Sequence, residues 1–103
     1  MAATIDTLRA MLDKEPGDPF LLYALAQAYA KAGDHPRAVE HYDHALQADP
    51  ASFYSYFHKA ISLRALGRQA EALAVARSGA AAARSGGDQK AFSELMGLAD
   101  ELE

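Results

Sequence analysis

Residues 18–50 read DPFLLYALAQAYAKAGDHPRAVEHYDHALQADP, and this stretch decides the fold. Its apolar residues recur twice in succession with the spacing of one face of an amphipathic helix. The two apolar stripes are Leu22, Leu25, Ala26 and Tyr29, followed by Ala38, Tyr42, Ala45 and Leu46. Small residues at Ala26 and Ala38 allow two helices to approach closely, and larger side chains beside them can fill the remaining volume. The stretch therefore predicts a pair of packed helices.

Cap and turn residues mark where these two helices begin and end. Asp18 followed by Pro19 is typical of a helix start, because the carboxylate accepts bonds from free amides and proline suits the first helical position. Gly33 can adopt the left-handed conformation that ends the first helix. Asp49 and Pro50 end the second helix, since proline has no amide hydrogen and disfavours helical backbone in the preceding residue.

The same pattern recurs 34 residues further along the chain. The matched positions are Leu22 with Tyr56, Ala26 with Ala60, Tyr29 with Leu63, Gly33 with Gly67, and Ala38 with Ala72. The N-terminal segment fits the second helix of such a pair, with an apolar stripe at Ile5, Leu8, Met11 and Leu12. A last stripe at Phe92, Leu95, Met96, Ala99 and Leu102 predicts a C-terminal capping helix. A repeat of this length predicts a helical solenoid.

We therefore expect one all-α domain of about six antiparallel helices. The expected helices lie near residues 2–14, 18–32, 35–48, 51–66, 69–85 and 88–102. The expected organisation is a half repeat at 1–17, full repeats at 18–52 and 53–87, and a capping helix at 88–103.

A family resemblance rests on Leu22, Ala26, Tyr29, Gly33, Ala38, Tyr42, Ala45 and Pro50. Together these residues resemble the signature of the tetratricopeptide repeat, and the resemblance extends over essentially the whole chain. The chain is also similar to small bacterial proteins that consist of little more than such repeats. The resemblance implies a right-handed superhelix whose first helices line a concave groove that holds a peptide or protein segment.

The second repeat departs from that signature at Lys59, Ala76, Gly79 and Arg84, where leucine, a large aromatic residue, alanine and proline are typical. Alanine in place of a large aromatic residue would leave a void unless another side chain fills it. We expect Phe92 or Met96 of the last helix to fill this space, and the local packing to be looser than in the first repeat.

If the apolar stripes face inward, other side chains of the first helices face the groove. The expected groove residues are Phe20, Tyr23, Gln27 and Ala30 in one repeat and Tyr54, Phe57, His58, Ile61 and Arg64 in the next, with Lys31 near the end of its helix. Aromatic anchors with a charged rim are typical of binding hot spots. Lys31 and Arg64 could pair with an acidic group of a partner. The alternatives are that a second copy of the chain, in a homodimer, or the chain's own ends cover this face.

Tetratricopeptide grooves that hold chaperone C-termini carry lysine and asparagine on the groove face. This chain has Tyr23, Gln27 and His58 there instead. The resemblance therefore does not extend to the binding of chaperone tails.

Charge and composition exclude several other classes of protein. Ten Lys and Arg residues against fourteen Asp and Glu residues give a net charge of −4, without a basic cluster, so we expect no nucleic-acid partner and favour a basic or neutral protein. The chain has no cysteine and no apolar run of membrane-spanning length, so we expect a soluble, cytoplasmic protein without a membrane partner. Leu102 and Glu103 could be residues left by an expression tag.

The sequence gives little support for catalysis or for metal binding. His41 and His44 lie three positions apart on one helix, a spacing that can place two imidazoles on one metal ion, but this outer face is interpreted as a solvated polar surface. No metalloprotease, phosphate-binding or Ser/His/Asp pattern is present. We therefore expect no catalytic residues, no cofactor and no enzymatic activity.

Overall fold

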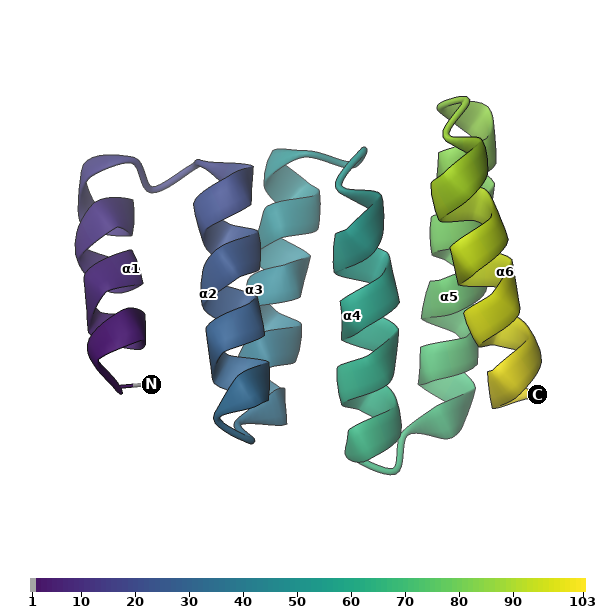
Figure 1. Ribbon diagram of the computed structural model, residues 1–103, viewed down its shortest axis with the longest axis horizontal. Coiled ribbons are helices and arrows are strands. Elements are labelled where there is room, and N and C mark those ends of the chain that lie inside the picture. The colour runs from purple at the N-terminus through teal and green to yellow at the C-terminus, as the bar shows by residue number, and fades with distance from the viewer. Residues whose placement is uncertain (1) are drawn as a thin grey trace.

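The computed structural model describes residues 2–103, which form six α-helices without a strand in that range (Figure 1). The helices are α1 (Ala2–Lys14), α2 (Pro19–Lys31), α3 (His35–Ala48), α4 (Phe53–Ala65), α5 (Gln69–Ser85) and α6 (Gln89–Leu102). The prediction of an all-α helical repeat solenoid is confirmed, and every helix boundary lies within two residues of its expected position.

The predicted caps are present at the helix ends. Asp18 accepts hydrogen bonds from the backbone amides of Phe20 and Leu21, at 2.9 and 3.2 Å. Gly33 and Gly67 end α2 and α4 with φ angles of 84° and 77°, a conformation that glycine adopts without the strain a side chain would cause. These caps fix the lengths of the repeating helices.

Each helix packs antiparallel to its neighbours, so α2, α4 and α6 run in the same direction and begin at the same end of the molecule (Figure 1). Close approach within the pairs depends on small residues, as predicted. Ala26 and Ala38 of the first pair and Ala60 and Ala72 of the second are all fully buried. The first helices of the repeats consequently form one continuous layer, with α3 and α5 behind them.

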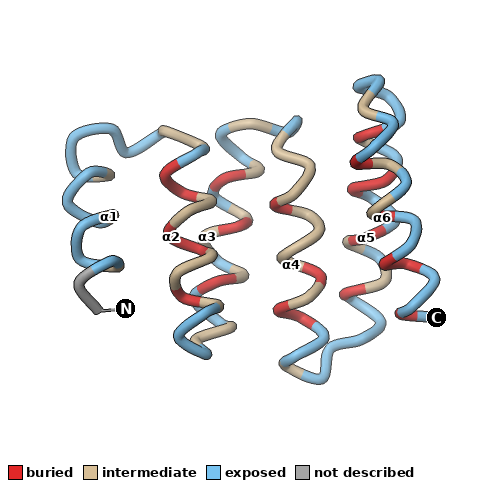
Figure 2. Tube along the Cα trace, viewed as in Figure 1, coloured by how far each residue is buried: buried red, intermediate tan, exposed pale blue. Residues whose placement is uncertain are grey.

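Helix α1 is the least covered of the six, and its described side chains, from Thr4 onward, include none that is fully buried (Figure 2). Ile5, Leu8 and Leu12 pack against the core of α2 and α3, as the apolar stripe predicts. Met11 is 47% exposed instead, so its predicted place in that stripe is wrong. Because α1 packs on α2 alone, its buried face is too narrow to include Met11.

The space beside Ala76 is filled by α6, but not by the side chains expected. Leu98, Ala99 and Leu102 pack around Ala76 in one buried cluster. Met96 is 39% exposed, whereas Phe92 belongs to a separate cluster nearer the start of α6. The buried face of α6 is rotated relative to the predicted stripe. It comprises Ala91, Leu95, Leu98, Ala99 and Leu102.

The C-terminal residues Leu102 and Glu103 also contact the body of the domain. The Leu102 side chain is 2% exposed, and its carbonyl accepts a 2.8 Å hydrogen bond from the side chain of Gln69. Glu103 forms a 2.7 Å ion pair with Arg77. Leu102 is therefore part of the core, whatever its origin.

Candidate functional site

The layer formed by α2, α4 and α6 carries an open, largely aromatic pocket at the end where these helices begin. Its volume is about 300 Å³. The lining residues are Phe20, Tyr23, Ala51, Ser52, Phe53, Tyr54 and Asp88. A smaller neighbouring pocket of about 180 Å³ shares three of these residues and adds Pro19 and Asp49. The two pockets adjoin each other at the starts of α2 and α4, and together they are called the hollow.

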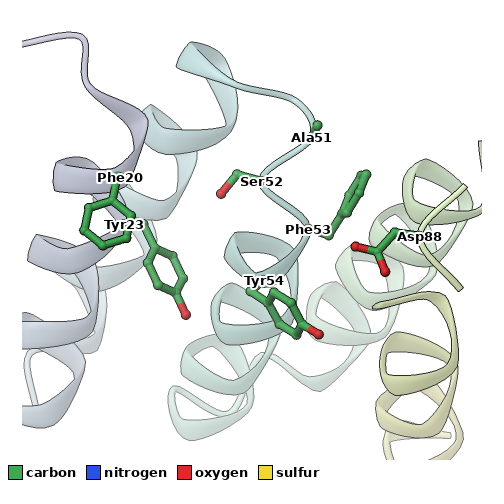
Figure 3. Close-up of a pocket in the computed structure, with 7 residues that line it drawn as sticks. All are labelled: Phe20, Tyr23, Ala51, Ser52, Phe53, Tyr54 and Asp88. Carbon is green, nitrogen blue, oxygen red and sulfur yellow. The ribbon is translucent and has the colours of Figure 1, made fainter. Parts of the chain in front are cut away.

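Side chains from three helices surround this hollow. In Figure 3, Tyr23 extends from α2 toward α4, and Asp88 extends from the start of α6 toward the aromatic residues of α4. Phe20 is 74% exposed, the highest value among the large apolar residues that the structure describes as exposed. Tyr23 is only partly exposed, and burial raises the pKa of its hydroxyl. The hollow therefore has a fixed aromatic floor and one freely exposed ring at its rim.

Carboxylates surround the aromatic side chains. Asp49 and Asp88 each use one oxygen to cap local backbone, accepting from the amides of Ala51 at 2.9 Å and Ala91 at 3.0 Å. The pKa of the Tyr54 hydroxyl is raised by loss of solvation, by a hydrogen bond with Glu94 and by the nearby negative charges of Glu94 and Asp88. The charged residues that line the two pockets are therefore both acidic.

Below the pocket, His58 of α4 is held among aromatic rings. Its ring centroid lies 5.2 Å from that of Phe57, 5.9 Å from that of Tyr23 and 6.4 Å from that of Tyr42. Burial lowers the pKa of His58, which favours the neutral imidazole near neutral pH. This cluster joins α2, α3 and α4 and supports the pocket from beneath.

Gln27 is fixed by a residue of the helix behind it. The hydroxyl of Tyr42 on α3 donates a short hydrogen bond to the side-chain oxygen of Gln27 on α2. Tyr42 is fully buried, and burial followed by the proximity of Tyr23 raises the pKa of its hydroxyl. Because the oxygen of Gln27 is already engaged, its amide N–H groups are what it can offer to a ligand.

The structure brings together some of the predicted groove residues but not all of them. Phe20, Tyr23 and Tyr54 line the pocket, while Gln27, Phe57 and His58 lie beside or below it. Ala30 packs against the core of α2 and α3 instead, and the remaining predicted residues, Ile61, Lys31 and Arg64, also lie outside the pocket lining.

These three residues have different surroundings. Ile61 is half-buried against the cluster shared by α4, α5 and α6. Arg64 lies 3.5 Å from Glu101 of α6, so the cation predicted for an acidic partner already has a partner in this chain. Lys31 is exposed at the far end of α2, where its charge complements the helix dipole.

Sequence reasoning missed part of the pocket. The lining residues that it did not assign there are Pro19, Asp49, Ala51, Ser52, Phe53 and Asp88, and it also did not identify Glu94 as a neighbour of Tyr54. The sequence places Asp49 at the end of one expected helix and Asp88 at the start of the C-terminal capping helix. Their sequence signal was their position next to the starts of α4 and α6, the same end of the molecule at which the aromatic residues cluster.

The two histidines considered for a metal ion lie on α3, with ring centroids 5.5 Å apart. Nδ1 of His41 lies 2.8 Å from the carbonyl oxygen of Arg37, which engages that nitrogen within its own helix. Within the described residues, no third histidine or carboxylate joins His41 and His44 in a metal-binding group. The pair therefore lacks the ligand set of a protein metal site.

Comparison with known families gives two matches, both described as tetratricopeptide repeat. One model matches residues 19–52 and the other residues 41–74. No curated protein sequence matches the chain significantly.

Solved structures resemble the chain over most of its length. A tetratricopeptide repeat domain protein from Salinibacter ruber is 32% identical, with 82% of this chain and 94% of that chain aligned at a TM-score of 0.75. A protein from Bordetella parapertussis is 31% identical over 99% of this chain and 89% of that one, at a TM-score of 0.84. The TPR2B domain of yeast Sti1, solved as a complex with pHsp70, has the same fold at 21% identity, with 95% and 78% covered and a TM-score of 0.88.

Proposed function

The chain belongs to the tetratricopeptide repeat family, and we propose that it is an interaction scaffold that binds a segment of a partner protein on the layer of α2, α4 and α6. The observation that carries this proposal is the aromatic pocket at the starts of these helices, with Phe20 74% exposed at its rim. Exposed aromatic side chains beside a hollow are typical of binding sites.

The interior of the pocket also suits a protein ligand. Tyr23 and Tyr54 offer rigid rings with polar ends, which bury much surface at a small entropic cost. Gln27 can donate hydrogen bonds to a backbone carbonyl, because its oxygen is held by Tyr42. A related fold in the Sti1 domain forms a complex with pHsp70, which supports an interaction role for this fold in general.

A second candidate is homo-oligomeric assembly through the same face. The exposure of Phe20 favours it, since a ring at the rim of one copy could enter the pocket of another. Both candidates use the same residues and differ in the identity of the occupant.

The remaining properties follow from the family and the composition. Tetratricopeptide repeat proteins are generally scaffolds without catalysis, and we extend this to the present chain. Within residues 2–103, no helix combines the length and apolar character needed to cross a membrane. We propose a cytoplasmic protein that binds protein and not nucleic acid, in line with its net charge of −4.

Photocrosslinking from the rim of the pocket tests both candidates in one experiment. Phe20 is replaced by the photoreactive residue p-benzoylphenylalanine in the native host, and crosslinked species are identified by mass spectrometry. A crosslink to a different protein is expected; a crosslink to a second copy of the chain would establish the oligomer instead. Because Phe20 is so exposed, this substitution should leave the melting temperature unchanged.

The matched control places the same photoreactive residue at Met11 on α1, which is also exposed but lies outside the pocket. Crosslinked products that appear from both positions reflect nonspecific contacts. If position 20 gives no product beyond those of position 11, neither a partner nor a second copy occupies this face, and both candidates are wrong.

A further inference from the structure

From the charges around the pocket we infer that its occupant is a protein segment carrying an arginine, whose side chain packs on the aromatic rings that line the pocket (Figure 3) and whose guanidinium pairs with Asp88. The inference rests on the proposed function and deepens it, since it states the chemistry of the partner. The inferred partner segment is basic, whereas Lys31 and Arg64 suggest an acidic partner from the sequence.

The first support is the sign of the charges at the hollow. Among the described residues that line the two pockets, none is lysine or arginine, whereas Asp49 and Asp88 both take part. Glu94 adds a third carboxylate at the Tyr54 hydroxyl. No ion pair within the described chain neutralises these three groups. An acidic segment would be repelled here, and a cationic one attracted.

The second support is that the carboxylates outweigh the helix dipoles. The starts of α2, α4 and α6 each contribute roughly half a positive charge at this end of the layer. Asp18 and Asp88 cap two of these starts and offset them. The cap residue of α4, Ser52, makes no side-chain capping bond, so the partial positive charge at the start of α4 is not offset by a cap. The two negative charges of Asp49 and Glu94 exceed this partial charge. The sum of these nearby charges is therefore negative.

The third support is the combination of flat rings with free carboxylate oxygens. Asp49 and Asp88 each use Oδ1 for capping, and within the described residues Oδ2 makes no hydrogen bond. A guanidinium can stack on an aromatic face and at the same time donate a hydrogen bond to the free Oδ2, whereas an ammonium has no flat face that stacks on a ring. A hollow of about 300 Å³ suits one long side chain and its apolar neighbour.

Three short peptides test this inference by NMR titration of the labelled chain at low salt. The first is acetyl-Gly-Leu-Arg-Leu-Gly-amide, the second has citrulline in place of arginine, and the third has glutamate there. Citrulline keeps the shape of arginine without its charge. We expect the arginine peptide to shift the amide resonances of Phe20, Ser52 and Tyr54 and to bind about 3- to 10-fold more tightly than the citrulline peptide. This advantage should shrink as salt is added.

Charge variants locate the interaction. Asp88→Asn removes the charge but keeps a residue suited to the cap position, so the fold should be retained. It should weaken the arginine peptide about 2- to 5-fold and leave the citrulline peptide unchanged. Asp34→Asn is the matched control, because Asp34 caps α3 in the same way at the opposite end of the molecule. It changes the net charge equally and should leave the binding of both peptides unchanged.

Equal binding of the arginine and citrulline peptides, tighter binding of the glutamate peptide, or an equal effect of Asp88→Asn and Asp34→Asn would each overturn the inference. In those cases a shift of the pocket resonances still supports a peptide-binding groove, so the proposed function would stand. If no peptide shifts these resonances, the inference is wrong, and crosslinking from position 20 decides the proposed function separately.

Discussion

Gly79 of α5 lies directly against Tyr56 of α4, so closely that a Cβ atom added at position 79 would be 2.5 Å from the Cβ of Tyr56. Leu95 of α6 approaches the same point, at 3.1 Å. The glycine therefore lets three helices meet in the second repeat. This close approach explains why a residue that weakens helices occupies a buried position in the middle of α5.

Gly79→Ala should lower the free energy of unfolding by about 1–3 kcal/mol, because the added methyl group collides with the rigid start of the Tyr56 side chain. Alanine has the higher helix propensity by roughly 1 kcal/mol, but this gain does not offset the cost of the collision. Urea denaturation followed by circular dichroism measures the change.

Gly97→Ala provides the control. Gly97 also lies inside a helix, but nothing lies within 4 Å of a Cβ added there. This variant should gain about 0.5–1 kcal/mol from helix propensity. Stabilisation by both substitutions would show that α4 and α5 can separate without cost.

The repeat explains how much of the fold the sequence predicts. Ala26, Ala60, Gly33 and Gly67 recur at the repeat length and lie where the pattern predicts, because small residues and left-handed turns have few alternatives. The face that α6 buries was predicted less well. Helix α6 packs mainly on α5 and only slightly on α4, and the alanine-rich surface of α5 can accept a partner helix that is rotated by part of a turn.

Leu98→Ala tests the register of α6 directly. Leu98 is 3% exposed and packs beside Ala76, so its truncation should cost about 2–5 kcal/mol of the free energy of unfolding. Met96→Ala removes a comparable side chain that is 39% exposed, and should change stability by no more than about 0.5 kcal/mol. Urea denaturation of both variants makes the comparison; a larger loss for Met96→Ala would restore the register predicted from the sequence.

The aromatic members of the pocket could be predicted from helix periodicity, whereas its carboxylates could not. Phe20, Tyr23 and Tyr54 lie on helix faces whose direction follows from the buried stripe. Asp49 and Asp88 lie at helix ends, far apart in the sequence, and meet the pocket only because α2, α4 and α6 begin at one end of the layer. Their capping bonds give a sufficient local reason for their presence, so the sequence gives no further signal that they line the pocket.

The bond between Tyr42 and Gln27 predicts a measurable contribution to stability. Tyr42→Phe keeps the buried ring and removes the hydroxyl, and should cost about 0.5–1.5 kcal/mol, because Gln27 loses its hydrogen-bond partner. Tyr56→Phe is the control, since within the described residues the Tyr56 hydroxyl makes no hydrogen bond. Thermal or urea unfolding of both variants gives the difference. Equal losses would mean that the bond between Tyr42 and Gln27 contributes nothing.

His58 predicts how stability depends on pH. Burial among Tyr23, Tyr42 and Phe57 lowers the pKa of His58 in the folded chain below its ordinary value of 6.5. The unfolded chain therefore binds a proton more readily than the folded chain as pH falls below about 6.5. The stabilising contribution of the neutral imidazole is complete above that pH and is lost as the pH falls through the folded pKa.

Melting temperatures measured at pH 7.5 and 5.5 should show this loss of stability as a decrease in melting temperature at the lower pH. His58→Gln cannot titrate and should therefore reduce the decrease in melting temperature. If His58→Gln has the same pH dependence as the wild type, the imidazole is not held neutral by its surroundings.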